Sequence, residues 1–112
     1  MWLMIYILNE DQYLDEILQG LLEIGITRAT IIESQGLLHF LADEIPIFVG
    51  FRYLFKGNKA FNKMIMSVIS DRELLEQAFS MMDEVTGGLH RGGRGVAFTL
   101  KIDEYRGPDL DT

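Results

Sequence analysis

Residues 62–102 read NKMIMSVISDRELLEQAFSMMDEVTGGLHRGGRGVAFTLKI, and this stretch predicts a strand, a helix, a glycine-rich loop and a second strand. Asn62–Ile69 is an apolar run of strand length. Ser70-Asp71-Arg72-Glu73 has the form of a capping box, which marks a helix start. Apolar residues then recur at helical spacing, as expected for a helix with one buried face. Val96–Ile102 completes the unit as its last strand.

The first half of the chain repeats this order. Trp2–Leu8 is a continuous apolar run, and Asn9 with Gln12 three residues later resembles a second capping box. Apolar residues at helical spacing follow, Gly25 is expected to end that helix, and Ala29–Ser34 is β-branched and strand-like up to Gly36. The order βαββαβ predicts an α+β, ferredoxin-like fold, with an antiparallel sheet covered on one face by two helices.

Size and composition limit the functional classes. The chain has 112 residues, a net charge of −7 and no cysteine. A single domain over residues 1–107 with a flexible tail at 108–112 is expected. The negative charge argues against nucleic-acid binding, which needs a broad basic face. Without cysteine there is no thiolate chemistry, and a cytoplasmic location is expected. The opening MWLMIYIL is expected to be a buried strand and not a signal peptide, and no apolar run is long enough to span a bilayer.

Residues 37–60 form an unusually long and apolar connection between the two halves. Three interpretations stay open: an extra strand that packs within an oligomer, a docking surface for a protein partner, and contact with a membrane surface that is peripheral at most. The apolar residues concerned are Ile45, Ile47, Phe48, Phe51, Leu54 and Phe55. The partner-binding candidates are Phe48, Phe51, Tyr53 and Phe55.

The loop TGGLHRGGRG, residues 86–95, concentrates glycine and arginine in an otherwise acidic chain. It is not a Walker motif, because it leads from a helix to a strand and has Gly95 where a magnesium-binding hydroxyl belongs. Successive glycines can nonetheless aim backbone N–H groups at an anion, and guanidinium groups can add charge-assisted hydrogen bonds. Gly88, Arg91 and Arg94 are therefore candidate phosphate-binding residues. The alternative is a flexible loop whose arginines pair with surface carboxylates.

The stretch EIGITRATIIESQG, residues 23–36, resembles the PII nitrogen-regulatory signal-transduction family. In that family a helix ends in Glu-x-Gly, a Thr-bearing strand follows, and Glu-x-x-Gly leads into a long T-loop, here residues 37–60. A glycine-rich B-loop beginning Thr-Gly corresponds to residues 86–95. The resemblance implies a homotrimer that binds ATP, ADP or AMP between subunits. By position it implies that the following residues contribute to the nucleotide site: Thr30, Gly36, Gly87, Gly92, Gly93, Arg94, Lys101 and Arg106.

The sequence also departs from that family. The B-loop is more basic than usual, Tyr53 lacks the motif around the family's modified tyrosine, and the T-loop is apolar. These features indicate a PII-like protein outside the typical nitrogen-regulator branch, with neither uridylylation nor 2-oxoglutarate binding implied. The expected function is regulatory and not enzymatic: ligand sensing, with a transporter or enzyme as the regulated target. Two alternatives remain: an interaction module without a small ligand, and a relative of the divalent-cation-tolerance proteins that binds metal through His39 or His90. No cofactor is expected.

Overall fold

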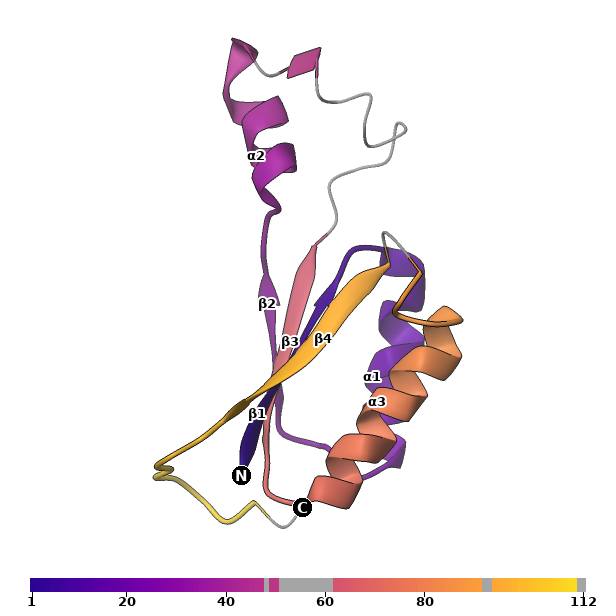
Figure 1. Cartoon of the computed structure of the whole chain (residues 1–112), viewed down its shortest axis with the longest axis vertical. Helices are drawn as coiled ribbons and strands as arrows, with labels where there is room; N and C mark the ends of the chain where they lie inside the picture. Colours follow the sequence, from indigo (N-terminus) through magenta and orange to yellow (C-terminus); the bar gives the residue numbers. More distant parts are fainter. Residues whose placement is uncertain (48, 51–61, 92–93, 111–112) are drawn as a thin grey trace.

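The structure, a computed structural model, describes residues 1–47, 49–50, 62–91 and 94–110. They form a four-stranded antiparallel sheet in the order β2-β3-β1-β4 (Figure 1). β1 (Trp2–Leu8) and β3 (Lys63–Ile69) are the central strands, while β2 (Ala29–Glu33) and β4 (Gly95–Lys101) form the edges. The predicted α+β, ferredoxin-like fold class is confirmed.

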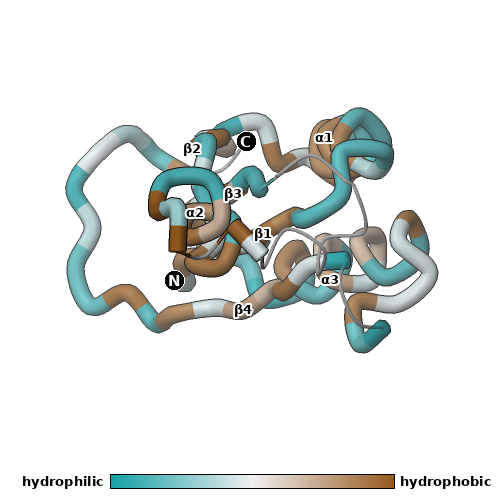
Figure 2. The backbone as a smooth tube through the Cα atoms, turned by 90° about the horizontal axis from the view of Figure 1, so that it is seen from above, coloured by the Kyte–Doolittle hydropathy of each residue, from teal (hydrophilic) through white to brown (hydrophobic). Residues whose placement is uncertain are grey.

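Two helices cover one face of this sheet. The 3-10 helix η1 (Asp11–Tyr13) leads directly into α1 (Leu14–Glu23), and α3 (Arg72–Thr86) runs beside α1 (Figures 1 and 2). The two helices approach closely at Gly20, where a Cβ atom would lie 2.6 Å from the Met81 sulfur. A glycine at this position therefore allows the helices to pack together without a clash.

The core lies between the sheet and these two helices. Every second residue of β1 points into it, as do alternate residues of β3 and one stripe of each helix. The buried set is Met4, Tyr6, Leu8, Ile17, Leu21, Ile26, Ile65, Ile69, Leu75, Ala78 and Met82. Burial of each large apolar side chain contributes about 1.5–3 kcal/mol, so this set supplies most of the driving force for folding.

The starts of α1 and α3 differ from the two capping boxes that the sequence predicted. The capping box predicted at Asn9 is wrong: α1 is preceded by η1, and the Gln12 side chain donates to Glu10 Oε2 at 2.8 Å. α3 is capped by Asp71 and not by Ser70, because Asp71 Oδ1 accepts the Glu73 N–H at 2.9 Å. Ser70 and Asp71 both have short oxygen-bearing side chains that suit an N-cap, and the sequence alone favours neither.

The connection between the halves begins with a helix. α2 (Leu37–Glu44) follows β2 after a short link and stands beyond the end of the sheet (Figure 1). The extra-strand interpretation concerned the residues from Ile45 to Phe55. Of these, Ile45 and Ile47 are described and neither lies in a strand, whereas Phe48, Phe51, Leu54 and Phe55 lie outside the described residues.

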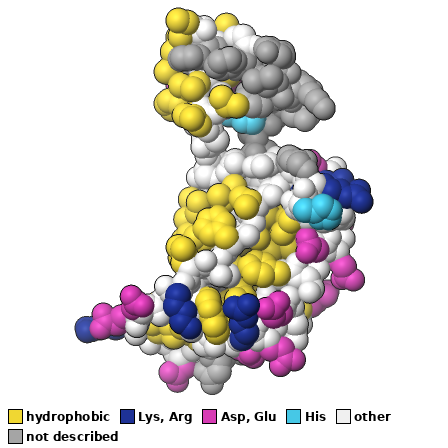
Figure 3. All heavy atoms as spheres, in the orientation of Figure 1, with side chains coloured by type: hydrophobic (Ala, Val, Ile, Leu, Met, Phe, Trp, Pro, Cys, Tyr) yellow, Lys and Arg dark blue, Asp and Glu magenta, His cyan; other side chains and the backbone are white. Residues whose placement is uncertain are grey.

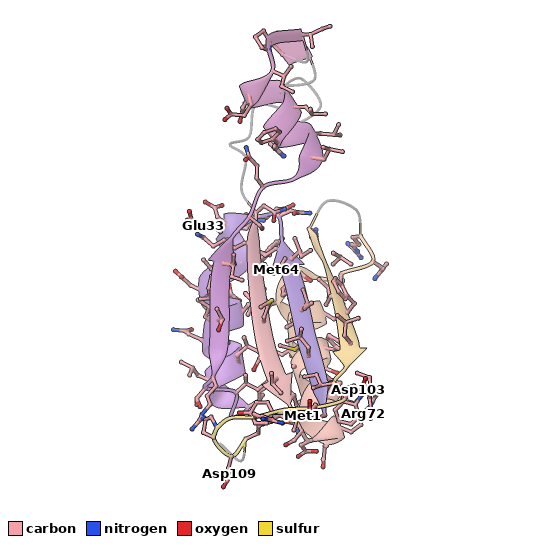
Figure 4. All side chains as sticks on the ribbon, turned by 90° about the vertical axis from the view of Figure 1, so that its left-hand side faces the viewer. Met1, Glu33, Met64, Arg72, Asp103 and Asp109 are labelled. Carbon is pink, nitrogen blue, oxygen red and sulfur yellow. The ribbon has the colours of Figure 1, made fainter. Side chains whose placement is uncertain are left out.

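The second face of the sheet is apolar, and none of the described helices covers it (Figures 3 and 4). Strand register places on this face Leu3, Ile5, Ile7, Thr30, Ile32, Met64, Met66, Val68, Val96, Phe98 and Leu100. Leu100 and Val96 are about half exposed, at 53% and 50%. We call this set the open sheet face.

Candidate functional site

The glycine-rich loop begins at the C-terminal end of α3. Gly87 is the C-cap residue with φ +79°, and Gly88 follows with φ +118°. Both values lie in the left-handed region, where a side chain would strain the backbone. The Thr86 hydroxyl donates to the Met82 carbonyl at 2.8 Å, which fixes the last turn of the helix. The glycines therefore turn the chain sharply away from the helix.

Three amides of this loop already have acceptors within the chain. Gly88 N–H donates to Thr86 Oγ1 at 3.4 Å, Leu89 N–H to Asp83 Oδ1 at 2.9 Å, and Arg91 N–H to the Gly88 carbonyl at 3.1 Å. These amides do not converge on a common point outside the loop. Gly92 and Gly93 lie outside the described residues. In the described part of the loop, charge for an anion therefore comes from side chains more than from the backbone.

The two arginines of the loop have different surroundings. Arg94 folds back over the end of α3, where Nη1 donates to the Thr86 carbonyl and the guanidinium lies 6.0 Å from the centre of the Tyr13 ring. A cation at a helix C-terminus also interacts favourably with the helix dipole. Arg91 is exposed, and its guanidinium has no hydrogen bond or ion pair with the residues that the structure describes. Arg94 thus holds the loop, while Arg91 is available to a ligand.

Tyr6 lies beneath this loop with an unsatisfied hydroxyl. The side chain is fully buried, and its oxygen has no hydrogen-bond partner among the described residues. A Cβ atom on Gly95 would lie 2.5 Å from the Ile7 carbonyl oxygen and 2.7 Å from the Tyr6 ring, so glycine is needed at the start of β4. The pKa of Tyr6 is raised to about 12. Burial is the largest cause, and the negative charges of Asp83 and Glu10 add to it. The phenol hydroxyl of Tyr6 therefore stays protonated, and its ring fills the space below the loop.

A row of hydrogen bonds runs along this end of the sheet, from the loop to Ser34, the residue that directly follows β2. The Asn9 N–H donates to the Arg94 carbonyl at 3.1 Å, and Asn62 Nδ2 donates to Asn9 Oδ1 at 2.8 Å. Ser34 N–H donates to the Asn62 carbonyl at 2.9 Å, and the Ser34 hydroxyl donates to Asn62 Oδ1. We call Arg94, Asn9, Asn62 and Ser34 the polar row. Sequence reasoning missed it, because it depends on strand register; Asn9 was interpreted as a helix cap.

An ion pair lies directly beside the polar row. Lys63 Nζ contacts Glu33 Oε1 at 2.6 Å, which joins the ends of β3 and β2. The hydrogen bond and the charge of Lys63 hold the pKa of Glu33 below its usual value. The Glu33 side chain is 87% exposed, so the pair contributes little to stability. The pair lies next to Ser34 in the chain.

The remaining predicted nucleotide-site residues are dispersed within one chain. Gly36 is the N-cap residue of α2, at the loop end of the sheet. Thr30 lies on the open sheet face. Lys101 is at the opposite end of β4, with its ammonium 4.5 Å from the centre of the Trp2 ring, and Arg106 contacts Glu104 at 3.8 Å beyond that end. The six residue steps from Gly95 to Lys101 span about 20 Å, so one ligand cannot touch the loop and Lys101 of the same chain.

Two adjoining cavities lie away from the loop, toward the end of the sheet where Lys101 lies. The first is about 370 Å³ and lies between the end of α1 and the start of α3; the second is about 310 Å³ and lies between Thr30 and the C-terminal segment. Arg28, Ser67, Val68 and Leu110 line both. Tyr105 also lines the second cavity and donates to the Pro108 carbonyl at 2.7 Å, so this segment is held in a turn there.

The described residues contain no group of three His, Asp or Glu side chains arranged to hold a metal ion. His90 packs against Gly88, where a Cβ atom would lie 2.6 Å from its ring, and His39 lies on α2. In the ranges the structure describes, no helix has the length and apolar character needed to cross a bilayer. The partner-binding candidates Phe48, Phe51, Tyr53 and Phe55 all lie outside the described residues.

Comparison with known proteins identifies the fold. Neither a protein-family model nor a curated protein sequence matches the chain. The chain is similar to a solved structure of Arabidopsis thaliana PII bound to citrate, with a TM-score of 0.56 at 18% sequence identity. The match covers 90% of this chain and 77% of that one. At this identity the likeness shows the fold and not the ligand: the chain has a PII-like fold.

Proposed function

We propose that this chain is a regulatory, non-enzymatic PII-like protein that binds a small anionic ligand at the glycine-rich loop and signals through the segment that begins with α2. The observation that carries the proposal is the polar row. It joins the carbonyl of Arg94, in the loop, to Ser34, which directly follows β2 and lies three residues before the start of α2. A ligand that moves Arg94 therefore shifts the anchor of α2.

The proposed ligand is an adenine nucleotide, bound through its phosphates. Arg91 supplies an exposed guanidinium, and Arg94 supplies a second one once it leaves the Thr86 carbonyl or shares it with the ligand. Guanidinium groups bind phosphate and carboxylate oxygens through paired N–H donors. The PII protein with a similar fold was solved with citrate, which is also a small anion. The proposal therefore rests on side-chain charge at the loop.

Coupling requires that the ligand favour one arrangement of the loop. In the structure the Arg94 side chain donates to the Thr86 carbonyl at the C-terminal end of α3. Ligand oxygens that compete for this guanidinium favour a second arrangement, in which the Arg94 carbonyl and the Asn9 amide shift together. The nucleotide thus changes the polar row without touching α2.

We further propose that the protein is a homotrimer, with the open sheet face as its interface. Exposed apolar patches of this extent usually mark protein contacts, and this face carries the half-exposed Val96, Phe98 and Leu100. Assembly also explains the dispersed site residues, because Lys101 and Arg106 of one subunit can approach the loop of another. Cytoplasmic location and a transporter or enzyme as regulated target belong to the same proposal.

Calorimetric titration tests the ligand assignment. We expect micromolar binding of ATP, ADP or AMP to the wild-type protein. Arg91→Ala removes a charge-assisted hydrogen bond of about 1.5–3 kcal/mol, so affinity should fall by about 10- to 100-fold. Arg91→Lys is the matched comparison, because lysine keeps the positive charge but lacks the paired N–H donors, so it should retain only part of the affinity. Equal nucleotide affinity in the wild type and in Arg91→Ala would show that Arg91 does not contribute to the binding site and would contradict the assignment of the loop.

An alternative function is an interaction module with no small ligand. It is favoured by the three loop amides that already donate within the chain. The same titration distinguishes the two functions, because the alternative predicts no heat with any nucleotide.

A further inference from the structure

The helix α2 buries its smallest apolar residue and exposes its largest ones. Ala42 is only 2% exposed, whereas Leu37 is 72% and Phe40 is 45% exposed. Leu38 is also exposed, and Leu41 is half-buried. This is the reverse of a helix that packs its apolar stripe on its own domain. The described part of the chain therefore leaves the apolar side of α2 uncovered.

A helix of this length does not stabilise itself. Eight residues are about half of what an isolated helix needs in water, and the N-cap residue Gly36 supplies no side-chain hydrogen bond. The helix also stands beyond the sheet, away from the core that α1 and α3 cover (Figure 1). Packing of its exposed side chains against an apolar surface would stabilise it.

The apolar side of α2 continues the open sheet face. In the space-filling view the hydrophobic side chains of α2 gather on the same side of the molecule as those of the sheet (Figure 3). Seen from the open sheet face, α2 stands directly above the strands (Figure 4). A cyclic trimer that buries the open sheet faces around an axis parallel to the strands therefore brings the α2 helices of its subunits to one end.

We propose that the occupant of the apolar side of α2 is the α2 helix of a second copy of this chain, so that the helices form an apolar cap at one end of the trimer. This inference rests on the trimer proposed above. The charged residues of α2 are Asp43 and Glu44, which disfavours contact with an anionic membrane surface. Through Ser34 and the polar row, the loop of each subunit would then act on a shared cap.

Cysteine cross-linking tests the cap directly, because the natural chain has no cysteine. Leu37→Cys places a single thiol on the exposed side of α2. Leu22→Cys is the matched control: Leu22 is a leucine 60% exposed on α1, on the opposite side of the sheet from the proposed interface. Both variants are oxidised gently as full-length protein and separated on a denaturing gel, while sedimentation equilibrium gives the mass of the native assembly.

We expect a covalent dimer from Leu37→Cys at a rate that does not change on dilution. Neighbours in one assembly experience an effective concentration of about 1 mM, so at about 10 μM protein the rate should exceed that of Leu22→Cys by about 100-fold. A trimer in which Leu37→Cys links no faster than Leu22→Cys overturns the cap and leaves the trimer intact. A monomer in sedimentation overturns the trimer and the cap with it.

Discussion

The buried hydroxyl of Tyr6 provides a quantitative test of the described core. The side chain is fully buried and its oxygen has no partner among the described residues. A hydroxyl buried without a hydrogen bond costs about 1–3 kcal/mol by mutational measures. Tyr6→Phe removes this oxygen and keeps the ring. We therefore expect the free energy of unfolding to rise by about 1–2 kcal/mol, where loss of a hydrogen-bonded hydroxyl would lower it by about 1 kcal/mol.

Urea unfolding followed by circular dichroism measures this change. The midpoint should move to higher urea concentration with an unchanged slope, and the melting temperature should rise by about 4 °C per kcal/mol for a chain of this size. Protein concentration is held constant, because an oligomer's stability depends on it. Tyr105→Phe is the control: its hydroxyl donates to the Pro108 carbonyl at 2.7 Å, so its loss should be neutral or slightly destabilising.

The pH dependence gives an independent test of the same residue. The pKa of Tyr6 is raised in the folded protein to about 12 from an ordinary value of 10.0. Above pH 10 the unfolded chain loses this proton first, so the contribution to stability is complete below pH 10 and is lost as the pH rises toward 12. The loss is about 1.4 kcal/mol per pH unit. Tyr6→Phe lacks it, so the difference between variant and wild type should widen above pH 10.

A Tyr6→Phe variant that is less stable than wild type by 1 kcal/mol or more would refute the reasoning, since the hydroxyl would then have a partner. A difference that stays constant between pH 9 and 11 would contradict the raised pKa of Tyr6.

Other predictions concern the helix ends, the helix contact and the loop. Asp71→Ala should lower the free energy of unfolding by about 1 kcal/mol, and Ser70→Ala should leave it nearly unchanged, as measured by urea denaturation; equal losses would return the cap to Ser70. Gly20→Val should cost about 1–3 kcal/mol because its side chain meets Met81, and the additional change Met81→Ala should recover part of that loss in a double-mutant cycle. Arg94→Ala should lower the melting temperature by an amount equivalent to about 1–2 kcal/mol, since Arg94 binds the Thr86 carbonyl, whereas Arg91→Ala should change it by less than about 0.5 kcal/mol. A greater loss for Arg91→Ala would reverse the roles assigned to the two arginines.

The sequence was sufficient for the fold because strand and helix periods differ clearly in each half. Trp2–Leu8 and residues 62–69 are apolar runs of strand length, and the stripe around Leu75 and Met82 has helical spacing. The helix over residues 37–44 was not predicted. Residues 37–44 were interpreted only as the start of the long connection 37–60, and the extra-strand interpretation applied to the apolar residues from Ile45 onward. In the structure residues 37–44 form a helix on which Leu37, Leu38 and Phe40 are exposed.

The candidate site was predictable only in part. Glycine and arginine content identified the loop, but the different roles of Arg91 and Arg94 follow from the end of α3, where a carbonyl and the Tyr13 ring bind the second guanidinium. Asn9 and Asn62 are far apart in sequence, and antiparallel pairing of β1 with β3 brings them together. No local pattern encodes that contact. The positions of Thr30, Lys101 and Arg106 in a shared site stay predictions, because they require a second subunit.

Hydrogen exchange of the α2 amides, residues 37–44, tests the proposed signalling route most directly. Exchange is measured without nucleotide and with saturating ATP, ADP or AMP, in the wild type and in Asn62→Ala, which interrupts the polar row. The account predicts that a bound nucleotide changes α2 exchange in the wild type, and that Asn62→Ala binds the nucleotide with similar affinity but shows a much smaller change. If a nucleotide binds and wild-type α2 exchange does not change, or if Asn62→Ala responds like wild type, the loop does not signal through the polar row.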